Sequence, residues 1–204
     1  MTPATRPVPA KARGAGSDAR ERILEAAYDL FSRQGIRAVG IDSIIERSGV
    51  ARMTLYRHFA SKDALALAFL ERREGRWTRD WLQREVEERT DDPAERLLAI
   101  FDVFDGWFQQ PGFEGCSFIN VLLEIADPAN ELHRASADYL ARVRAFVEGL
   151  AAAAGIADPE AFARQWHILM KGSIVSAGEG DLRAARRAQE VGRLLLLQKL
   201  PAAR

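Results

Sequence analysis

The sequence predicts an all-α fold. Apolar residues recur three and four positions apart along most of the chain, which is the spacing of an amphipathic helix, and no segment shows the alternation typical of a strand. Three Asp-Pro pairs, Asp92-Pro93, Asp127-Pro128 and Asp158-Pro159, each predict a helix start. At such a start the Asp side chain caps free amides, and proline has no amide to leave unpaired. We therefore expect five or six helices after residue 75.

The composition excludes several classes of protein. Of the 204 residues 48% are hydrophobic and 28% are charged, which is a globular balance. The longest stretches without a charged side chain, residues 115–123 and 149–157, have nine residues each. A membrane-spanning helix needs about 20 apolar residues, so no membrane partner is expected.

Cysteine and histidine usage points away from disulfide and metal chemistry. The single cysteine, Cys116, cannot form an internal disulfide, and no Cys and His cluster has zinc spacing. We expect neither a metal nor a cofactor. Because no apolar signal-peptide core follows the first residues, we expect the reducing cytoplasm as the location.

Charge is distributed unevenly along the chain. The formal net charge is zero, from 29 basic and 29 acidic residues. Residues 1–74 hold 13 basic against 9 acidic residues, a net of +4, and residues 75–204 hold 16 against 20, a net of −4. This asymmetry favours a polyanion as the partner of the N-terminal part.

The first 16 residues predict a flexible tail, since they combine proline with small residues and show no apolar period. Its basic residues Arg6, Lys11 and Arg13 could reach a DNA minor groove, or could carry incidental charge. A helix is expected to begin at Ser17 or Asp18, where Glu21 completes a capping box, and to end at Gly35.

Residues 41–63, IDSIIERSGVARMTLYRHFASKD, predict a helix-turn-helix. A short helix ends near Ser48, Gly49 supplies the turn, and a second helix runs from about residue 51 to 59. One side of this second helix is expected to be buried through Ala51, Leu55 and Phe59. The opposite side carries Arg52, Met53, Tyr56 and Arg57. Arg can read guanine edges and hydroxyl groups can bind phosphates, although the same spacing also fits an ordinary helical hairpin with a charged solvent face.

The segment SGVARMTLYRHFASKDAL (Ser48–Leu65), preceded by ERILEAAYDLFSRQG (Glu21–Gly35), resembles the DNA-binding domain of TetR-family transcriptional regulators. The resemblance implies a helix-turn-helix domain at 17–63, a connecting helix at about 62–76, and a ligand-binding and dimerisation domain at 77–204. It also implies that Lys62, beside the helix cap Ser61, meets a DNA phosphate, and that the DNA-facing residues are Arg52, Met53, Thr54, Tyr56, Arg57 and His58.

Three positions depart from the pattern of that family. Gly40 and Ala51 stand where Thr or Ser often caps a helix, which weakens each cap by about 1 kcal/mol. Met53 replaces a common Gly, and it could touch a thymine methyl group that Gly could not reach.

The larger C-terminal part contains aromatic residues with a few polar groups among them. These residues either line a pocket for an apolar small molecule or form an ordinary core. The candidate ligand-binding residues are Phe104, Trp107, Phe108, Phe118, Asn120, Glu124 and Tyr139, with Asn120 and Glu124 as the polar contacts. Cys116 is interpreted as a small buried residue, with a redox-sensing thiol as the alternative.

Two amphipathic helices are expected at about Glu160–Ala177 and Leu182–Leu200. Their apolar stripes predict a dimer interface, as the resemblance also implies, and internal packing is the alternative. The candidate interface residues are Phe162, Trp166, Leu169, Ser173, Ala177, Val191, Leu194, Leu195 and Gln198.

We therefore predict a homodimeric, ligand-responsive DNA-binding regulator, most simply a repressor that a small apolar effector releases from a palindromic operator. A helical adaptor that binds protein through the helix-turn-helix face is the alternative. An enzyme is not expected, because no catalytic motif is visible and His58, His133 and His167 lie far apart in sequence.

Overall fold

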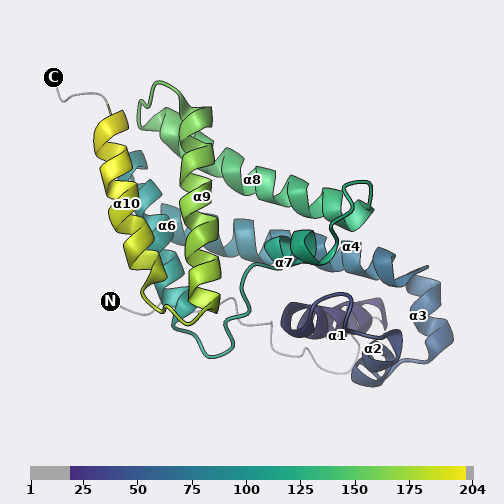
Figure 1. The fold of residues 1–204 in the computed structure, drawn as a ribbon. Helices are drawn as coiled ribbons and strands as arrows, with labels where there is room; N and C mark the ends of the chain where they lie inside the picture. The colour runs from purple at the N-terminus through teal and green to yellow at the C-terminus, as the bar shows by residue number, and fades with distance from the viewer. Residues whose placement is uncertain (1–18, 201–204) are drawn as a thin grey trace. The chain divides into compact units, whose positions relative to one another are not determined.

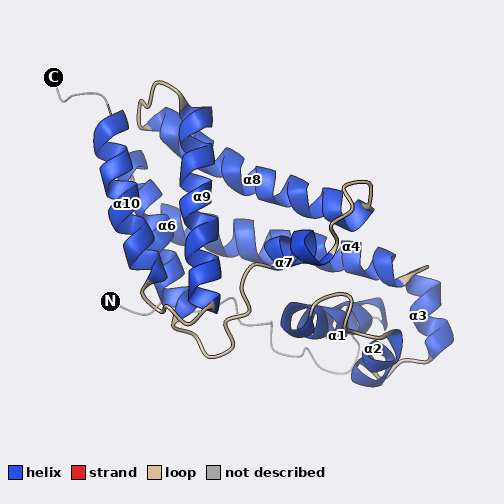
Figure 2. Ribbon diagram, in the orientation of Figure 1, coloured by secondary structure: helices blue, strands red, loops and turns tan. Residues whose placement is uncertain are grey.

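The computed structural model describes residues 19–200, and within this range it consists of helices joined by loops (Figure 2). The all-α prediction is confirmed. The predicted tail with Arg6, Lys11 and Arg13 and the predicted first cap at Ser17 or Asp18 lie outside the described residues. The elements (Figure 1) are α1 (Ala19–Gln34), α2 (Ile41–Ser48), α3 (Arg52–His58), α4 (Lys62–Arg73), the π-helix η1 (Glu74–Gln83), α5 (Arg84–Glu87), α6 (Pro93–Phe108), α7 (Ser117–Glu124), α8 (Glu131–Ala153), α9 (Pro159–Gly178) and α10 (Ala184–Lys199).

Two of the three Asp-Pro pairs begin helices as predicted. The Asp92 carboxylate accepts hydrogen bonds from the amides of Ala94 at 2.8 Å and Glu95 at 3.2 Å. Asp158 accepts from the Ala161 amide at 3.1 Å.

The prediction of a helix start at Asp127 is wrong. Its carboxylate accepts from the Ala129 amide at 2.9 Å within a turn. α8 begins only at Glu131, where the Asn130 side chain accepts from the Leu132 amide at 2.8 Å. An Asp side chain stabilises a turn as readily as a helix start, so the pair alone does not distinguish the two.

The chain forms two compact units. Among the described residues the N-terminal unit comprises 19–76 and 116–139, and the C-terminal unit comprises 77–115 and 140–200. The chain passes from one unit to the other between Arg76 and Trp77. Residues 116–139 group with α1–α4.

α1 is the centre of the N-terminal unit, since α2, α3 and α4 all pack against it. Its buried face consists of Ile23, Leu24, Ala26, Ala27 and Phe31. Phe69 of α4 meets the rings of Phe31 and Tyr28 edge-on, with ring centroids 5.5 Å apart in each case. This packing fixes where α2 and α3 lie on the surface of the unit.

The C-terminal unit is built on α6, α9 and α10. Trp77 and Trp81 of η1 join Phe104, Trp107 and Phe108 of α6 in an aromatic cluster, in which the Trp77 and Trp107 rings are 4.9 Å apart. Within residues 19–200 no helix has the length and apolar character needed to cross a bilayer.

At Gly192, α10 packs so closely against Trp166 of α9 and Phe101 of α6 that there is no room for a side chain. A Cβ atom at this position of α10 would lie 2.8 Å from Cη2 of Trp166 and 3.3 Å from Cε2 of Phe101. Both rings are completely buried, so neither can move aside freely.

We predict that Gly192→Ala lowers the free energy of unfolding by about 1–3 kcal/mol, because the added methyl group overpacks the core. Gly149→Ala is the matched control: Gly149 is an exposed residue in α8, and no atom lies within 4 Å of an added Cβ there. The control should gain about 0.5–1 kcal/mol from helix propensity. Denaturant unfolding of both variants measures the effect, and equal stabilisation by the two substitutions would contradict it.

The buried His167 of α9 should make the fold less stable in acid. The side chain is 3% exposed, and burial, assisted by the positive charges of Lys171 and Arg144, lowers its pKa from 6.5 to about 4. The unfolded chain therefore takes up the proton first as pH falls, and stability decreases from pH 6.5 to pH 4, by about 2–3 kcal/mol in all. His167→Gln cannot titrate and should show a flatter dependence over this window. The measurement is the free energy of unfolding at a series of pH values. If it falls equally in wild type and variant between pH 6.5 and pH 4, His167 makes no contribution.

Candidate nucleic-acid interface

The predicted helix-turn-helix is present as α2, a turn and α3. Gly49 adopts φ +65°, and its amide donates to the Ile45 carbonyl at 3.0 Å. Gly40 and Ala51 precede the two helices without a side-chain capping bond. Leu55 and Phe59 are buried as predicted. The expected burial of Ala51 is wrong, because this residue precedes the first turn of α3 and is exposed.

α3 turns a compact set of side chains outward. Met53 is 79% exposed and Tyr56 is 41% exposed, whereas Leu55 is fully buried. At about 100° per residue, Met53 lies about 200° around the helix from Leu55 and so faces away from the unit. Of the residues predicted to face DNA, Arg52, Met53, Tyr56 and Arg57 are exposed, and Thr54 and His58 are half-buried.

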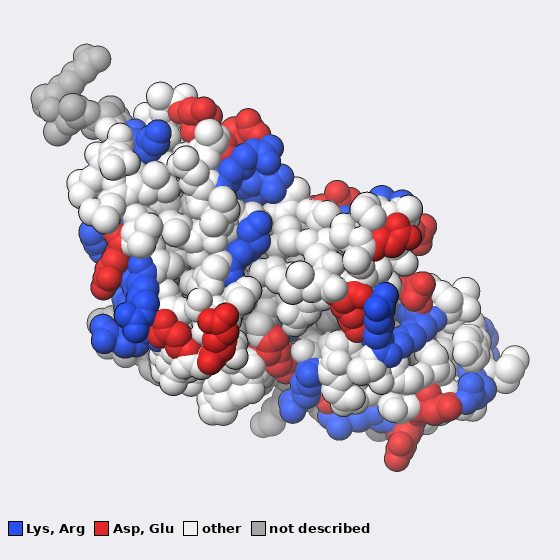
Figure 3. Space-filling view, in the orientation of Figure 1, with Lys and Arg blue, Asp and Glu red and all other residues white. Residues whose placement is uncertain are grey.

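The two exposed arginines of α3 differ in their partners. Arg52 forms an ion pair with Asp42 of α2. Arg57 has no ion-pair partner in the part of the chain that the structure describes. Basic and acidic side chains are interspersed on the face shown in Figure 3, so no large region of a single sign covers it.

Lys62 lies in the first turn of α4, as predicted. The Ser61 hydroxyl caps this helix by accepting from the Ala64 amide at 3.0 Å. The Lys62 ammonium donates to the Arg37 carbonyl at 3.3 Å. A cation beside a helix N-terminus is a suitable place for a phosphate, because the free amides and the helix dipole both favour an anion.

The loop after α1 is held by Glu124 of α7. The two carboxylate oxygens accept from the amides of Ile36 at 3.1 Å and Arg37 at 2.6 Å. Gly35 has φ +81°, and a Cβ atom there would lie 3.2 Å from Glu124 Oε1. The carboxylate that we predicted as a ligand contact is therefore engaged within the fold.

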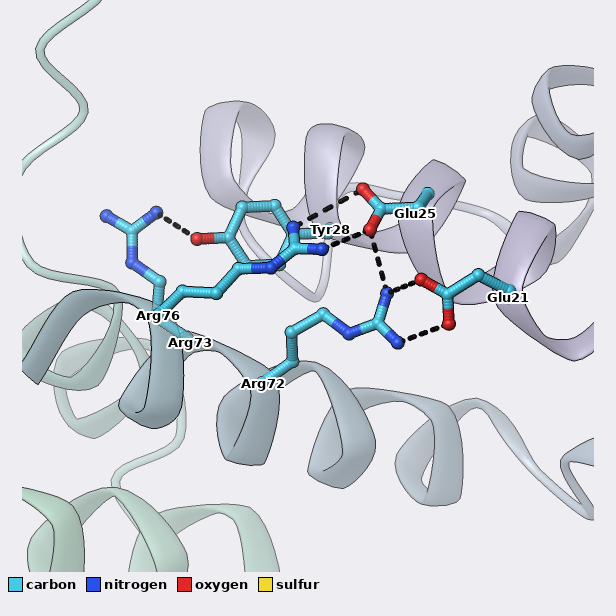
Figure 4. Close-up of polar contacts among 6 residues, drawn as sticks. All are labelled: Glu21, Glu25, Tyr28, Arg72, Arg73 and Arg76. Carbon is cyan, nitrogen blue, oxygen red and sulfur yellow. Dashed lines mark hydrogen bonds and ion pairs between the residues drawn. The ribbon is translucent and has the colours of Figure 1, made fainter. Parts of the chain in front are cut away.

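A network of charged groups joins α1 to α4 (Figure 4). The Arg72 guanidinium donates to Glu21 at 2.8 and 2.6 Å and to Glu25 at 2.9 Å. Arg76 also pairs with Glu25. Arg72 holds the pKa of Glu21 below its ordinary value, mainly through these hydrogen bonds.

Arg73 completes the contact between the two helices. This arginine is buried and donates to the Tyr28 hydroxyl at 3.2 Å and to the Ser32 hydroxyl at 3.4 Å. Our sequence reasoning missed the whole network. A signal was present in the sequence: Glu21 and Glu25 of α1 are four residues apart, and so are Arg72 at the end of α4 and Arg76 in η1.

Known proteins resemble this chain both in sequence and in fold. Residues 23–69 match the family model described as "Bacterial regulatory proteins, tetR family". The structure of SCO4454, a TetR-family transcriptional regulator from Streptomyces coelicolor, is similar with a TM-score of 0.79 and 29% identity, over 89% of this chain and 95% of that chain. The N-terminal helices thus match the TetR family model, and the fold as a whole is similar to that of a TetR-family regulator.

Two curated relatives show how far the sequence likeness extends. The chain is 38% identical over 80 residues to the HTH-type transcriptional regulator Rv1255c of Mycobacterium tuberculosis, and the match covers 39% of either protein. It is 24% identical over 178 residues to YjdC of Escherichia coli, covering 84% of this chain and 91% of the relative. The strongest sequence likeness thus lies in about two fifths of the chain.

The relatives named above are all named as transcriptional regulators. Within residues 19–200 no three His, Cys, Asp or Glu side chains are grouped as a metal site. Cys116 is buried, and burial raises the pKa of its thiol above the ordinary value. A thiol in this environment is a packing residue and a poor redox sensor.

The residues that we predicted to contact a ligand divide between the two units. Phe104, Trp107 and Phe108 lie together in the aromatic cluster of the C-terminal unit. In the N-terminal unit the rings of Phe118 and Tyr139 are 5.2 Å apart. Asn120, in the same unit, is exposed on α7.

The predicted dimer residues fall on two different sides of α9 and α10. The interior of the C-terminal unit contains Phe162, Trp166, Ser173 and Ala177, and Leu169 and Leu195 are half-buried. Val191, Leu194 and Gln198 are exposed. On α9 the exposed apolar side chains are Ile168 and Val175. Our prediction followed the larger aromatic residues of α9, and these form the internal face.

We predict that Arg72→Ala lowers the free energy of unfolding by about 1–3 kcal/mol, because it leaves Glu21 and Glu25 without their shared donor. The Arg72 side chain is only 16% exposed. Arg164→Ala is the control, since Arg164 pairs with Glu160 on α9 and is 60% exposed. That loss should be about 0.5 kcal/mol or less. Both variants are measured by denaturant unfolding. If they lose equal free energy of unfolding, the α1–α4 network stabilises the fold no more than an exposed ion pair does.

Proposed function

We propose that this protein is a homodimeric DNA-binding transcriptional regulator that inserts α3 into the DNA major groove. The observation that carries the proposal is the outward placement of Arg52, Met53, Tyr56 and Arg57 on a helix anchored from behind by Leu55. A recognition helix needs this division, because base edges are read by exposed side chains and the helix must stay rigid. Lys62 contacts a phosphate beside the groove.

We propose repression as the mode of regulation. Over 85 residues, covering 40% of each protein, the chain is 34% identical to KstR2 of Mycobacterium tuberculosis, which is named a transcriptional repressor. A small apolar effector would release the operator by binding more tightly to a conformation that does not fit DNA. A regulator of this kind acts on the chromosome, so we propose the cytoplasm as the location of the protein.

The aromatic cluster of the C-terminal unit is the proposed effector site. Among the described residues, the indole nitrogens of Trp77 and Trp81 and the Thr78 hydroxyl are buried without a hydrogen-bond partner. Buried donors without a partner cost stability, so they suggest a bound acceptor. An apolar effector that carries a carbonyl or similar acceptor would suit these donors and the surrounding rings.

The exposed apolar side chains of α9 and α10 are the evidence for a dimer interface on these helices. Ile168 and Leu194 are each 63% exposed, and Val175 and Val191 are about half exposed at 48% and 50%. Exposed apolar residues that follow neighbouring helices typically mark a protein interface. Pairing two copies would present two α3 helices to successive major grooves about 34 Å apart.

We predict that selection from random duplex DNA enriches a two-fold symmetric site. On that site Arg57→Ala should weaken binding at least tenfold in an anisotropy titration, because it removes a base or phosphate contact. Arg84→Ala, an exposed arginine of α5, is the control and should leave affinity unchanged. Wild-type affinity should fall steeply as salt rises. Salt-independent binding, or no enriched sequence, would contradict the proposal and favour a protein-binding adaptor.

We predict that Leu194→Glu converts the dimer to a monomer in sedimentation velocity, because a carboxylate would be buried without a partner. The monomer should bind the symmetric site far more weakly, since the two half-sites are no longer linked. Leu123→Glu makes the same change at a leucine of α7 that is 78% exposed, and it should stay dimeric. A wild-type monomer, or an unchanged dimer in Leu194→Glu, would contradict the assigned surface.

A further inference from the structure

Met53 is exposed in a way that the fold does not require. Its exposed fraction of 79% is the greatest among the large hydrophobic side chains of the described residues. The helix it belongs to is anchored by Leu55, which is fully buried, and by Phe59, which is 4% exposed. Met53 therefore offers almost its whole thioether side chain to whatever α3 binds.

The neighbour of Met53 on the outer side of α3 is Arg57. Residues four apart on a helix have Cβ atoms about 6 Å from each other, so the two side chains form one outward ridge. Asp42 already pairs with Arg52, whereas Arg57 has no ion-pair partner within residues 19–200. The ridge thus presents an apolar group directly beside an available guanidinium.

The major groove provides a matching pair of groups. Guanine O6 and N7 are acceptors that a guanidinium binds in a bidentate manner. The apolar group on the major-groove edge of a base pair is the C5-methyl group of thymine. The flexible, polarisable side chain of methionine adapts well to such a small apolar group.

We propose that Met53 contacts the C5-methyl group of a thymine in each operator half-site and so determines a preference for thymine there. The inference rests on the proposed DNA-binding function. Because base pairs are stacked about 3.4 Å apart, the spacing between Met53 and Arg57 places this thymine within two base-pair steps of a guanine bound by Arg57.

Deoxyuridine tests the contact directly, since it differs from thymidine only in lacking the methyl group. Each thymine of the selected operator is replaced by deoxyuridine, in both half-sites together, and affinity is measured by anisotropy. At one symmetric position wild-type binding should weaken about fourfold for each half-site, or about fifteenfold in all. Met53→Ala should bind the thymine and uracil operators equally.

Two controls separate this contact from general effects. Met53→Ala changes an exposed residue, so its melting temperature should match that of wild type. Leu123→Ala removes another large, exposed apolar side chain from α7, and it should keep the full preference for thymine over uracil.

Binding of the selected operator with no uracil-sensitive position, or with equal sensitivity in wild type and Met53→Ala, would overturn this inference and leave the proposed function standing. Absence of binding to every oligonucleotide at low salt would instead overturn the proposed function, and this inference with it.

Discussion

The packing of α3 against α1 is the interaction on which the rest of the interface depends. A helix of seven residues is too short to be stable alone, since its nucleation costs more than its few hydrogen bonds return. Leu55 and Phe59 supply the missing stability by burial, and the Arg20 guanidinium lies 5.2 Å from the centre of the Phe59 ring. Only because α3 is anchored in this way can its outward side chains keep a fixed geometry.

Sequence reasoning succeeded where local rules decide the structure. The spacing of Leu55 and Phe59, the turn at Gly49 and the cap at Ser61 each depend on neighbouring residues alone. It failed where distant segments meet. The contact of Glu124 with the Ile36 amide spans 88 residues, and no local pattern points to it. On α9 both sides carry apolar residues, so periodicity identified the helix but could not choose its outward face.

Because residues 116–139 belong to the N-terminal unit, the two units are joined by more than one segment of the chain. The chain passes between the two units after residues 76, 115 and 139, and not only through the helix that follows Lys62. Within the N-terminal unit, Glu124 holds the amides of the loop after α1, and Lys62 holds a carbonyl of the same loop. An effector at the proposed site in the C-terminal unit would therefore have more than one covalent route to the groups that position α3 and Lys62.

Native-state hydrogen exchange tests the anchoring of α3 most directly. The Leu55 amide donates to the Ala51 carbonyl at 3.2 Å, and the Phe59 amide donates to the Leu55 carbonyl at 2.9 Å. If α3 is held only by its packing on α1, these amides should exchange through the same opening as the buried centre of α1, with free energies that agree within about 0.5 kcal/mol. Rapid exchange of the Leu55 and Phe59 amides, while those of α1 stay protected, would contradict the account.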